Sequence, residues 1–195
     1  MKNTARILAF SGSLRRESWN RRLVELAASS AEKSGAKVTL INLKDHPLPI
    51  FDQDLEDEHG LPDEAIELKS LFRSHDGLLI ASPEYNGSYS AALKNTVDWM
   101  TRPDPKHPGT SCFRGKVAGL MSCSPGRLGG IRGLPSLRHL LSGIGTMVLA
   151  RQVAVPMISD ELGESSTLAT ESFQQAIDDL GRELVEVIEA LNSNS

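Results

Sequence analysis

Residues 5–20 read ARILAFSGSLRRESWN and fall into two parts of opposite character. Residues 5–10 are apolar apart from one arginine, which is typical of a buried strand. Residues 11–19 bring one glycine, three serines and two arginines, and residues 20–34 place apolar side chains on one face of a predicted helix that Gly35 ends. A strand, a polar loop and a helix in this order predict the first unit of a parallel α/β sheet.

The same alternation continues along the rest of the chain. Apolar runs bounded by turn residues predict four further strands, at 37–42, 77–82, 116–123 and 146–153. Helical periodicity predicts four further helices, at 62–73, 90–101, 130–141 and 171–191, with a long loop at 43–61. Parallel strands need crossover connections, which place helices on both faces of the sheet. We therefore predict one α/β domain over residues 1–195, built on a five-stranded parallel sheet.

Composition narrows the class of protein further. The chain has 195 residues, a formal net charge of −4 and 39% hydrophobic residues, which suits a globular domain. Its two cysteines, Cys112 and Cys123, are too few for a disulfide framework or a zinc site, and no metal site is expected. The sequence shows neither a membrane-spanning run nor a signal peptide, so we expect a cytoplasmic protein without a membrane partner.

Charge is unevenly distributed along the chain. Residues 102–151 carry eight basic residues and one acidic residue, whereas residues 160–195 carry nine acidic residues and one basic residue. Basic segments within an acidic chain favour local anion sites and argue against a nucleic-acid partner, which would favour a basic total. For most of these charges a solvated surface remains the simpler interpretation.

The loop after the first predicted strand is typical of a phosphate site. Ser13, Ser18 and Asn20 can donate hydrogen bonds to phosphate oxygens and Arg15 can add a charge-assisted bond, directly before a helix N-terminus. The alternative is that Ser18 only caps the helix and the arginines are solvated. The spacing matches neither the Walker A motif nor G-x-G-x-x-G, because only Gly12 is present, so a phosphate monoester fits best. FMN is the leading candidate.

Two further loops lie at the same predicted edge of the sheet, where ligands of such sheets bind. The loop after 77–82 reads PEYNGS at 83–88, where Asn86-Gly87 predicts a turn with backbone groups facing a ligand and Tyr85 offers an aromatic wall. The loop after 116–123 reads SPGRLGG at 124–130, whose glycines allow close backbone approach to a planar group. Ordinary loop residues and a flexible turn are the alternatives. Cys123 is a weak candidate nucleophile, because a buried thiol is usually inert.

These motifs in this order resemble the NADPH-dependent FMN reductase family, whose members include quinone, azo-dye and chromate reductases on a flavodoxin-like fold. The resemblance covers residues 5–155 and extends to Leu93-Lys94-Asn95 and Asp98-Trp99. Ser90 departs from it, since the family usually has proline there. The resemblance implies that the first loop holds the FMN phosphate, the second lines the isoalloxazine ring and the third closes the site. The implied cofactor-binding residues are Ser13, Arg15, Ser18, Trp19 and Asn20; Pro83, Glu84, Tyr85, Asn86 and Gly87; and Ser124, Gly126 and Gly129.

The resemblance also implies a reaction. Hydride would pass from NADPH or NADH to the flavin and electrons then to a small-molecule acceptor, a scheme that requires no side-chain acid or base. We therefore name no catalytic residue, and Arg127 or Arg132 is the candidate contact for the 2′-phosphate of NADPH. The alternatives are an electron carrier of the flavodoxin type and a binding module without flavin.

The helix predicted at 90–101 suggests self-association. Leu93, Val97, Trp99 and Met100 give it more apolar surface than one covered face of a sheet needs, and Tyr89 and Trp99 are large aromatics of the kind that anchor interfaces. We therefore expect a homodimer or a homotetramer.

Overall fold

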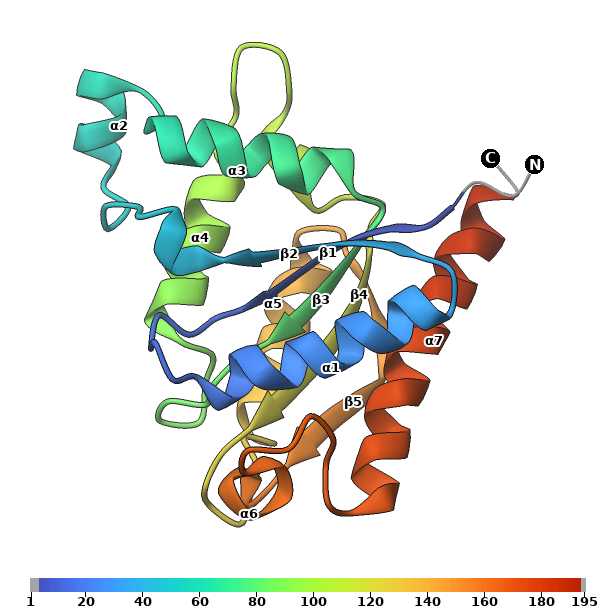
Figure 1. Ribbon diagram of the computed structural model, residues 1–195. Coiled ribbons are helices and arrows are strands. Elements are labelled where there is room, and N and C mark those ends of the chain that lie inside the picture. The colour runs from blue at the N-terminus through green and yellow to red at the C-terminus, as the bar shows by residue number, and fades with distance from the viewer. Residues whose placement is uncertain (1–3, 194–195) are drawn as a thin grey trace.

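The computed structural model describes residues 4–193, and within them five strands form one parallel sheet in the order β2-β1-β3-β4-β5 (Figure 1). The strands are β1 (Arg6–Ser11), β2 (Lys37–Asn42), β3 (Gly77–Ala81), β4 (Val117–Cys123) and β5 (Met147–Val155). The strand order changes direction between β1 and β3, as in the flavodoxin-like doubly wound sheet. The predicted fold class is confirmed.

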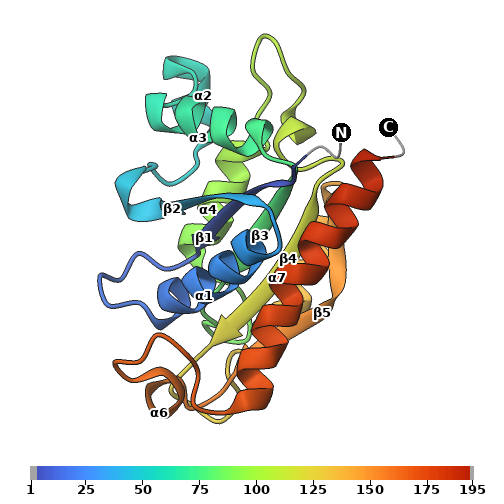
Figure 2. The same cartoon turned by 45° about the vertical axis from the view of Figure 1, so that its right-hand side comes forward.

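Helices cover both faces of this sheet. On one face α1 (Trp19–Lys33) and α7 (Glu171–Asn192) lie side by side, as Figure 2 shows. The other face carries α3 (Asp63–Ser74), α4 (Ala91–Met100) and α5 (Gly133–Gly143). Each layer has its own core, and β3 and β4 are buried along their whole length because they lie between the two layers. In the second core the rings of Phe10 and Phe113 each lie 5.5 Å from that of Phe72, between centroids.

The predicted loop at 43–61 contains two elements that the sequence reading missed. They are a 3₁₀ turn, η1 (Leu43–Asp45), and the helix α2 (Gln53–His59). The acidic stretch at 52–58 lies within this predicted loop, and that part of the prediction was wrong, because Gln53–His59 is helical. Asp52 caps α2 by accepting a hydrogen bond from the Asp54 N–H at 2.9 Å, and Gly60 follows the last turn with a φ of 75°. No residue of α2 is buried, so its sequence lacks the apolar stripe that usually indicates a helix.

The remaining boundaries differ from the predictions by a few residues at most, apart from a second short helix, α6 (Ile158–Leu162), and a 3₁₀ turn, η2 (Gly109–Cys112). Helix α4 begins immediately after Ser90, the residue at which the sequence departs from the family that it resembles. The Ser90 hydroxyl accepts from the Leu93 N–H at 3.1 Å and donates to the Gly12 carbonyl. Ser90 therefore caps α4 and ties it to the loop after β1.

The aromatic residue predicted to anchor a subunit interface is buried within its own chain. Trp99 is 0% exposed, its ring lies 5.1 Å from that of Phe51, and its Nε1 donates to the Pro49 carbonyl at 2.8 Å. Leu93 and Met100 are also 0% exposed. The prediction of Trp99 as an interface anchor was wrong, because α4 is covered by the sheet on one side and by the segment around Phe51 on the other.

Strands β4 and β5 are paired with an irregularity. Ala118 pairs with Val148, and two residues later Leu120 pairs with Gln152, so β5 contains extra residues there. The guanidinium of Arg138, from α5, donates to the carbonyls of Val148, Leu149 and Ala150. One side chain thus satisfies the carbonyls that the interrupted ladder releases.

Within residues 4–193, none of the helices combines the length and the apolar character needed to cross a lipid bilayer.

Candidate functional site

Three loops meet at the edge of the sheet where the strands end, on both sides of the switch in strand order. They follow β1 (residues 12–18), β3 (82–90) and β4 (124–132), and Figure 1 shows all three on the same side of the sheet. Hydrogen bonds connect them: Gly12 N–H donates to the Ala81 carbonyl at 2.9 Å, and the Ser122 hydroxyl donates to the Ser82 carbonyl at 2.7 Å. This is the position where open α/β sheets bind ligands.

The loop after β1 is shaped by its own serines. The Ser11 hydroxyl accepts from Ser13 N–H at 3.2 Å, and the Ser13 hydroxyl accepts from Arg15 N–H at 3.3 Å. Ser18 is the N-cap of α1 and accepts from Arg21 N–H at 3.3 Å. The capping alternative is therefore realised for Ser18. All three hydroxyls keep their protons for another acceptor, because each acts as an acceptor in these bonds.

The same loop offers backbone donors to an anion. Among the described residues no hydrogen-bond partner is found for the N–H groups of Leu14, Arg16 and Glu17. They lie just before the N-terminus of α1, where the helix dipole favours negative charge, and the first turn of α1 contains no acidic residue. Arg15 is exposed beside them. The donor set suits a phosphate.

Trp19 and Asn20 are engaged in tertiary contacts. The Asn20 amide donates from Nδ2 to the Cys123 carbonyl at 3.0 Å and accepts from Cys123 N–H at Oδ1, also at 3.0 Å. It thus joins the start of α1 to the end of β4, and one Nδ2 hydrogen remains for a ligand. The ring of Trp19 packs against the core, with the guanidinium of Arg22 at 5.0 Å from its centroid.

The loop after β3 ends in a tight hairpin. Tyr85 and Ser88 exchange two backbone hydrogen bonds, at 2.9 and 3.1 Å, around Asn86 and Gly87. The φ angles of these two residues are 53° and 78°, as a type I′ turn requires. The turn expected from Asn-Gly is confirmed. Pro83 is buried at the root of the hairpin, and Tyr85 is 52% exposed at its tip.

Glu84 faces away from solvent and joins this hairpin to the next loop. Its Oε1 accepts from Arg132 Nε at 2.7 Å and lies 2.5 Å from Arg132 Nη2, while its Oε2 accepts from the N–H groups of Arg132 and Gly133 at 3.0 and 3.2 Å. The side chain is only 7% exposed. The carboxylate therefore serves as the cap of α5, a role that residues 48 positions apart do not reveal in the sequence.

The loop after β4 is fastened to the turn between β5 and α6. The carbonyls of Ser124 and Gly126 accept from Ile158 and Met157 N–H at 3.1 and 3.2 Å, and the Ser124 hydroxyl donates to the Gly126 carbonyl at 3.3 Å. Gly129 has a φ of 59°, and a Cβ there would lie 2.6 Å from the backbone of Val155. The glycine is needed because the loop passes against β5 backbone to backbone.

Large apolar side chains around these loops are left open to solvent. Leu14, Tyr85, Leu128 and Ile131 are 50–53% exposed and come from all three loops. Only Tyr85 was predicted from the sequence. The others were missed because each is isolated among polar residues, and only the fold brings the loops together. These side chains would offer apolar contacts to a ligand held between the loops.

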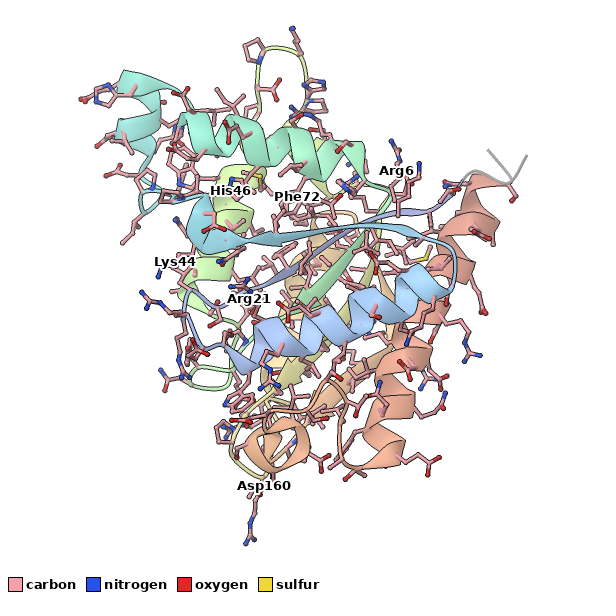
Figure 3. All side chains as sticks on the ribbon, in the orientation of Figure 1. Arg6, Arg21, Lys44, His46, Phe72 and Asp160 are labelled. Carbon is pink, nitrogen blue, oxygen red and sulfur yellow. The ribbon has the colours of Figure 1, made fainter. Side chains whose placement is uncertain are left out.

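Basic side chains lie at the same end of the sheet. Figure 3 shows Arg21, Lys44 and His46 near the ends of the strands, whereas Arg6 lies at the opposite end, where it pairs with Asp76 at 2.7 Å.

The thiol of Cys123 is 2% exposed, and burial raises its pKa, so it is held as the neutral thiol. This favours the inert interpretation of Cys123 over a nucleophile.

Comparison with known proteins identifies the family. The family model described as NADPH-dependent FMN reductase matches residues 5–160. The chain belongs to the NADPH-dependent FMN reductase family. It is 31% identical over 186 residues to an NAD(P)H-dependent FMN reductase of Pseudomonas aeruginosa, covering 95% of this chain and 92% of that protein.

Two further similar proteins are also oxidoreductases. A probable NADPH:quinone oxidoreductase of Oryza sativa subsp. japonica is 35% identical over 135 residues, which are 69% of this chain and 63% of the rice protein. The flavoenzyme NAD(P)H:(acceptor) oxidoreductase of Paracoccus denitrificans has a similar structure, with a TM-score of 0.81, 26% identity and coverage of 96% of this chain and 98% of that one. This reductase is thus an FMN-dependent oxidoreductase with NAD(P)H as its co-substrate, rather than an electron carrier alone.

The residues present fit FMN. The loop after β1 supplies unpaired N–H groups, three hydroxyls and Arg15 for a phosphate, and the hairpin and the loop after β4 supply exposed apolar walls and glycine backbone for a planar ring. When bound, FMN supplies the hydride and electron transfer chemistry. The chain itself binds and orients the cofactor.

Proposed function

We propose that the three loops form one FMN site, with the phosphate at residues 11–20, the ring beside residues 83–87 and the third side at residues 124–130. The observation that carries the proposal is that unpaired N–H groups at the start of α1 and half-exposed apolar side chains lie on loops at the same end of the sheet. A monophosphate with a planar ring needs these two surfaces together. A dinucleotide would need the glycine pattern that this chain lacks.

The acceptor that suits the site is a quinone or another small planar compound. The rice relative is named as a quinone oxidoreductase, and the open apolar side chains Leu14, Tyr85, Leu128 and Ile131 would pack against such a ring. NAD(P)H and the acceptor would use the same open side of the site by turns. Arg132 is committed to Glu84, so Arg127 is the better candidate for contact with a 2′-phosphate.

We further propose that the protein acts as a homodimer or homotetramer in the cytoplasm. Ile50 is 87% exposed, yet its segment is held firmly: Asn95 Oδ1 accepts from Phe51 N–H, and Asn95 Nδ2 and Trp99 Nε1 both donate to the Pro49 carbonyl, each at 2.8 Å. Among the described residues Ile50 is the most exposed large apolar side chain, and contact with a second copy of the chain would cover it. The free cysteines Cys112 and Cys123 are compatible with a reducing compartment.

Steady-state kinetics test the reductase proposal. Released cofactor should run as FMN on chromatography, and initial rates at several NADPH and benzoquinone concentrations should give parallel double-reciprocal lines, because the two substrates alternate at one site. Protein that stays colourless with excess FMN would contradict the cofactor site. Intersecting lines would contradict the shared site and leave the cofactor site standing.

A further inference from the structure

The hairpin after β3 and the loop after β4 form opposite sides of the proposed ring site, and one carboxylate connects them. Glu84 belongs to the hairpin and accepts three hydrogen bonds, one from Arg132 Nε and two from the backbone N–H groups of Arg132 and Gly133, and its Oε1 also forms an ion pair with Arg132 Nη2. The carboxylate is thus fully used on the protein side. Each of its two oxygens already faces two donor atoms of the protein.

Close backbone approach surrounds this link. Gly133 lies against the hairpin, since a Cβ on it would be 3.2 Å from the Ser88 carbonyl oxygen. Gly130 has a φ of 83°, and a Cβ there would clash with the Ser122 hydroxyl, which itself bonds to Ser82 at the root of the hairpin. A side chain at 133 would therefore push the helix start away from the hairpin, and one at 130 would displace Ser122 at the end of β4.

The electrostatics of the link are balanced. The guanidinium of Arg132 and the positive end of α5 both face the carboxylate, so the charge of Glu84 is compensated where it lies. The guanidinium contacts Oε1 through Nε and Nη2, while two backbone N–H groups hold Oε2, and contacts at both oxygens fix the orientation of the carboxylate, which a single point contact would not. The hairpin is thereby fixed in both distance and angle relative to α5.

We propose that Glu84 and Arg132 are a positioning pair that sets the width of the ring site and so aligns bound FMN for hydride transfer. This inference rests on the proposed FMN site. Hydride transfer is sensitive to such alignment, because a misplacement of about 1 Å can cost about 100-fold in rate. The phosphate loop does not take part in the pair, so cofactor affinity should depend on it less than rate does.

The test uses FMN-loaded enzyme and the variants Glu84→Ala, Glu84→Gln and Arg132→Ala, with Glu183→Ala as the matched control. Glu183 lies on α7, away from the three loops, and pairs with Arg151 of β5 at 3.1 Å. Its loss therefore removes an ion pair without touching the site. The readouts are the stopped-flow rate of flavin reduction by NADPH, the visible circular dichroism of the bound flavin, and the dissociation constant of FMN.

For Glu84→Ala we expect a fall of about 10- to 100-fold in the reduction rate, altered flavin dichroism and a smaller change in FMN affinity. Glu84→Gln should recover part of the rate, because its amide oxygen still accepts from the N–H groups of α5. Arg132→Ala leaves the carboxylate on both N–H groups and should show an intermediate rate, which keeps the test open if Glu84→Ala does not fold.

The inference is overturned if Glu84→Ala, or Arg132→Ala where the former does not fold, reduces its flavin at the rate of the wild type with unchanged dichroism. Equal losses in all variants including Glu183→Ala would also overturn it, since they would reflect general destabilisation. Failure of the proposed function is distinguishable, because the wild-type protein would then take up no FMN.

Discussion

Among the exposed charged residues, Arg15 has the clearest predicted role, which is contact with the FMN phosphate. No hydrogen bond or ion pair of its guanidinium is found among the described residues, and it lies beside the unpaired N–H groups before α1. A hydrogen bond to a charged group contributes about 1.5–3 kcal/mol, so Arg15→Ala should weaken FMN binding about 10- to 150-fold. Fluorescence titration of apoprotein measures it, with Arg151→Ala as the control. An unchanged dissociation constant would mean that Arg15 is merely solvated.

Asp104 gives a prediction on pH. Burial alone would raise its pKa, but hydrogen bonds from His107 Nδ1 and Lys106 N–H, together with the charge of Arg73, lower the pKa to about 2. The folded pKa lies below the unfolded value near 4, so the carboxylate stabilises the fold above pH 4 and this contribution is lost as pH falls from 4 to 2. Asp104→Asn should lower Tm at pH 7 and match the wild type near pH 2.

Thermal unfolding from pH 7 to pH 2 measures this, and the exposed Asp160→Asn serves as the control (Figure 3). A constant difference in Tm between Asp104→Asn and the wild type across the whole range would contradict the assigned titration.

At the residue scale the sequence predicted donors better than it predicted their partners. Ser13, Ser18 and Arg15 were found as polar groups before a helix, because local order along the chain determines that arrangement. Asn20 was expected to bind phosphate, and its contact with Cys123 spans 103 residues. Glu84 was likewise expected at the cofactor, and its bonds to Arg132 could be seen only in three dimensions.

At the scale of elements, apolar periodicity predicted every strand and each of the longer helices, and it failed where there was no apolar stripe. Helix α2 is held by the Asp52 cap and Gly60, and α6 has five residues. The irregularity in β5 was also missed, because the carbonyls of its extra residues accept hydrogen bonds from Arg138, which belongs to another element. Apolar patterns along the sequence indicate which residues are buried. They do not reveal α2, α6 or the irregularity in β5, because these depend on caps and on donors from distant residues.

Arg138 is expected to stabilise the pairing of β4 and β5. Its guanidinium is the donor to three successive carbonyls of β5, so Arg138→Ala should cost about 2 kcal/mol and lower Tm by about 4–8 °C. Arg138→Lys should recover only part, because one ammonium cannot reproduce the planar fork. Arg151→Ala, which removes an exposed ion pair, should change stability by less than about 1 kcal/mol. Equal Tm values for Arg138→Ala and Arg151→Ala would show that water replaces the guanidinium.

At the scale of the whole molecule, the order of strands and the three loops together indicated a cofactor site, whereas the aromatic side chain expected to anchor self-association is buried within its own chain. The sequence pointed to Trp99, a large aromatic on an amphipathic helix, but this ring packs inside the chain. Its indole instead helps to hold the segment that exposes Ile50. Which apolar side chains remain outside depends on the packing of the entire chain, so composition and periodicity could not select them.

Ile50 is therefore the side chain on which the homodimer can be tested. In a two-fold interface each substitution counts twice, and burying an isoleucine is worth about 1.5–3 kcal/mol, so Ile50→Glu should weaken the dimer by at least about 100-fold. Light scattering at micromolar concentration should give a multiple of the 21.2 kDa chain mass for the wild type and that mass for the variant.

The Tm of the monomer should hardly change on Ile50→Glu, because Asn95 and Trp99 fix the backbone of this segment and not the side chain of Ile50. Met147→Glu, which also charges an apolar side chain 53% exposed, is the control on β5. A wild-type protein that is monomeric and fully active would contradict self-association, and a variant that stays dimeric would move the interface away from Ile50.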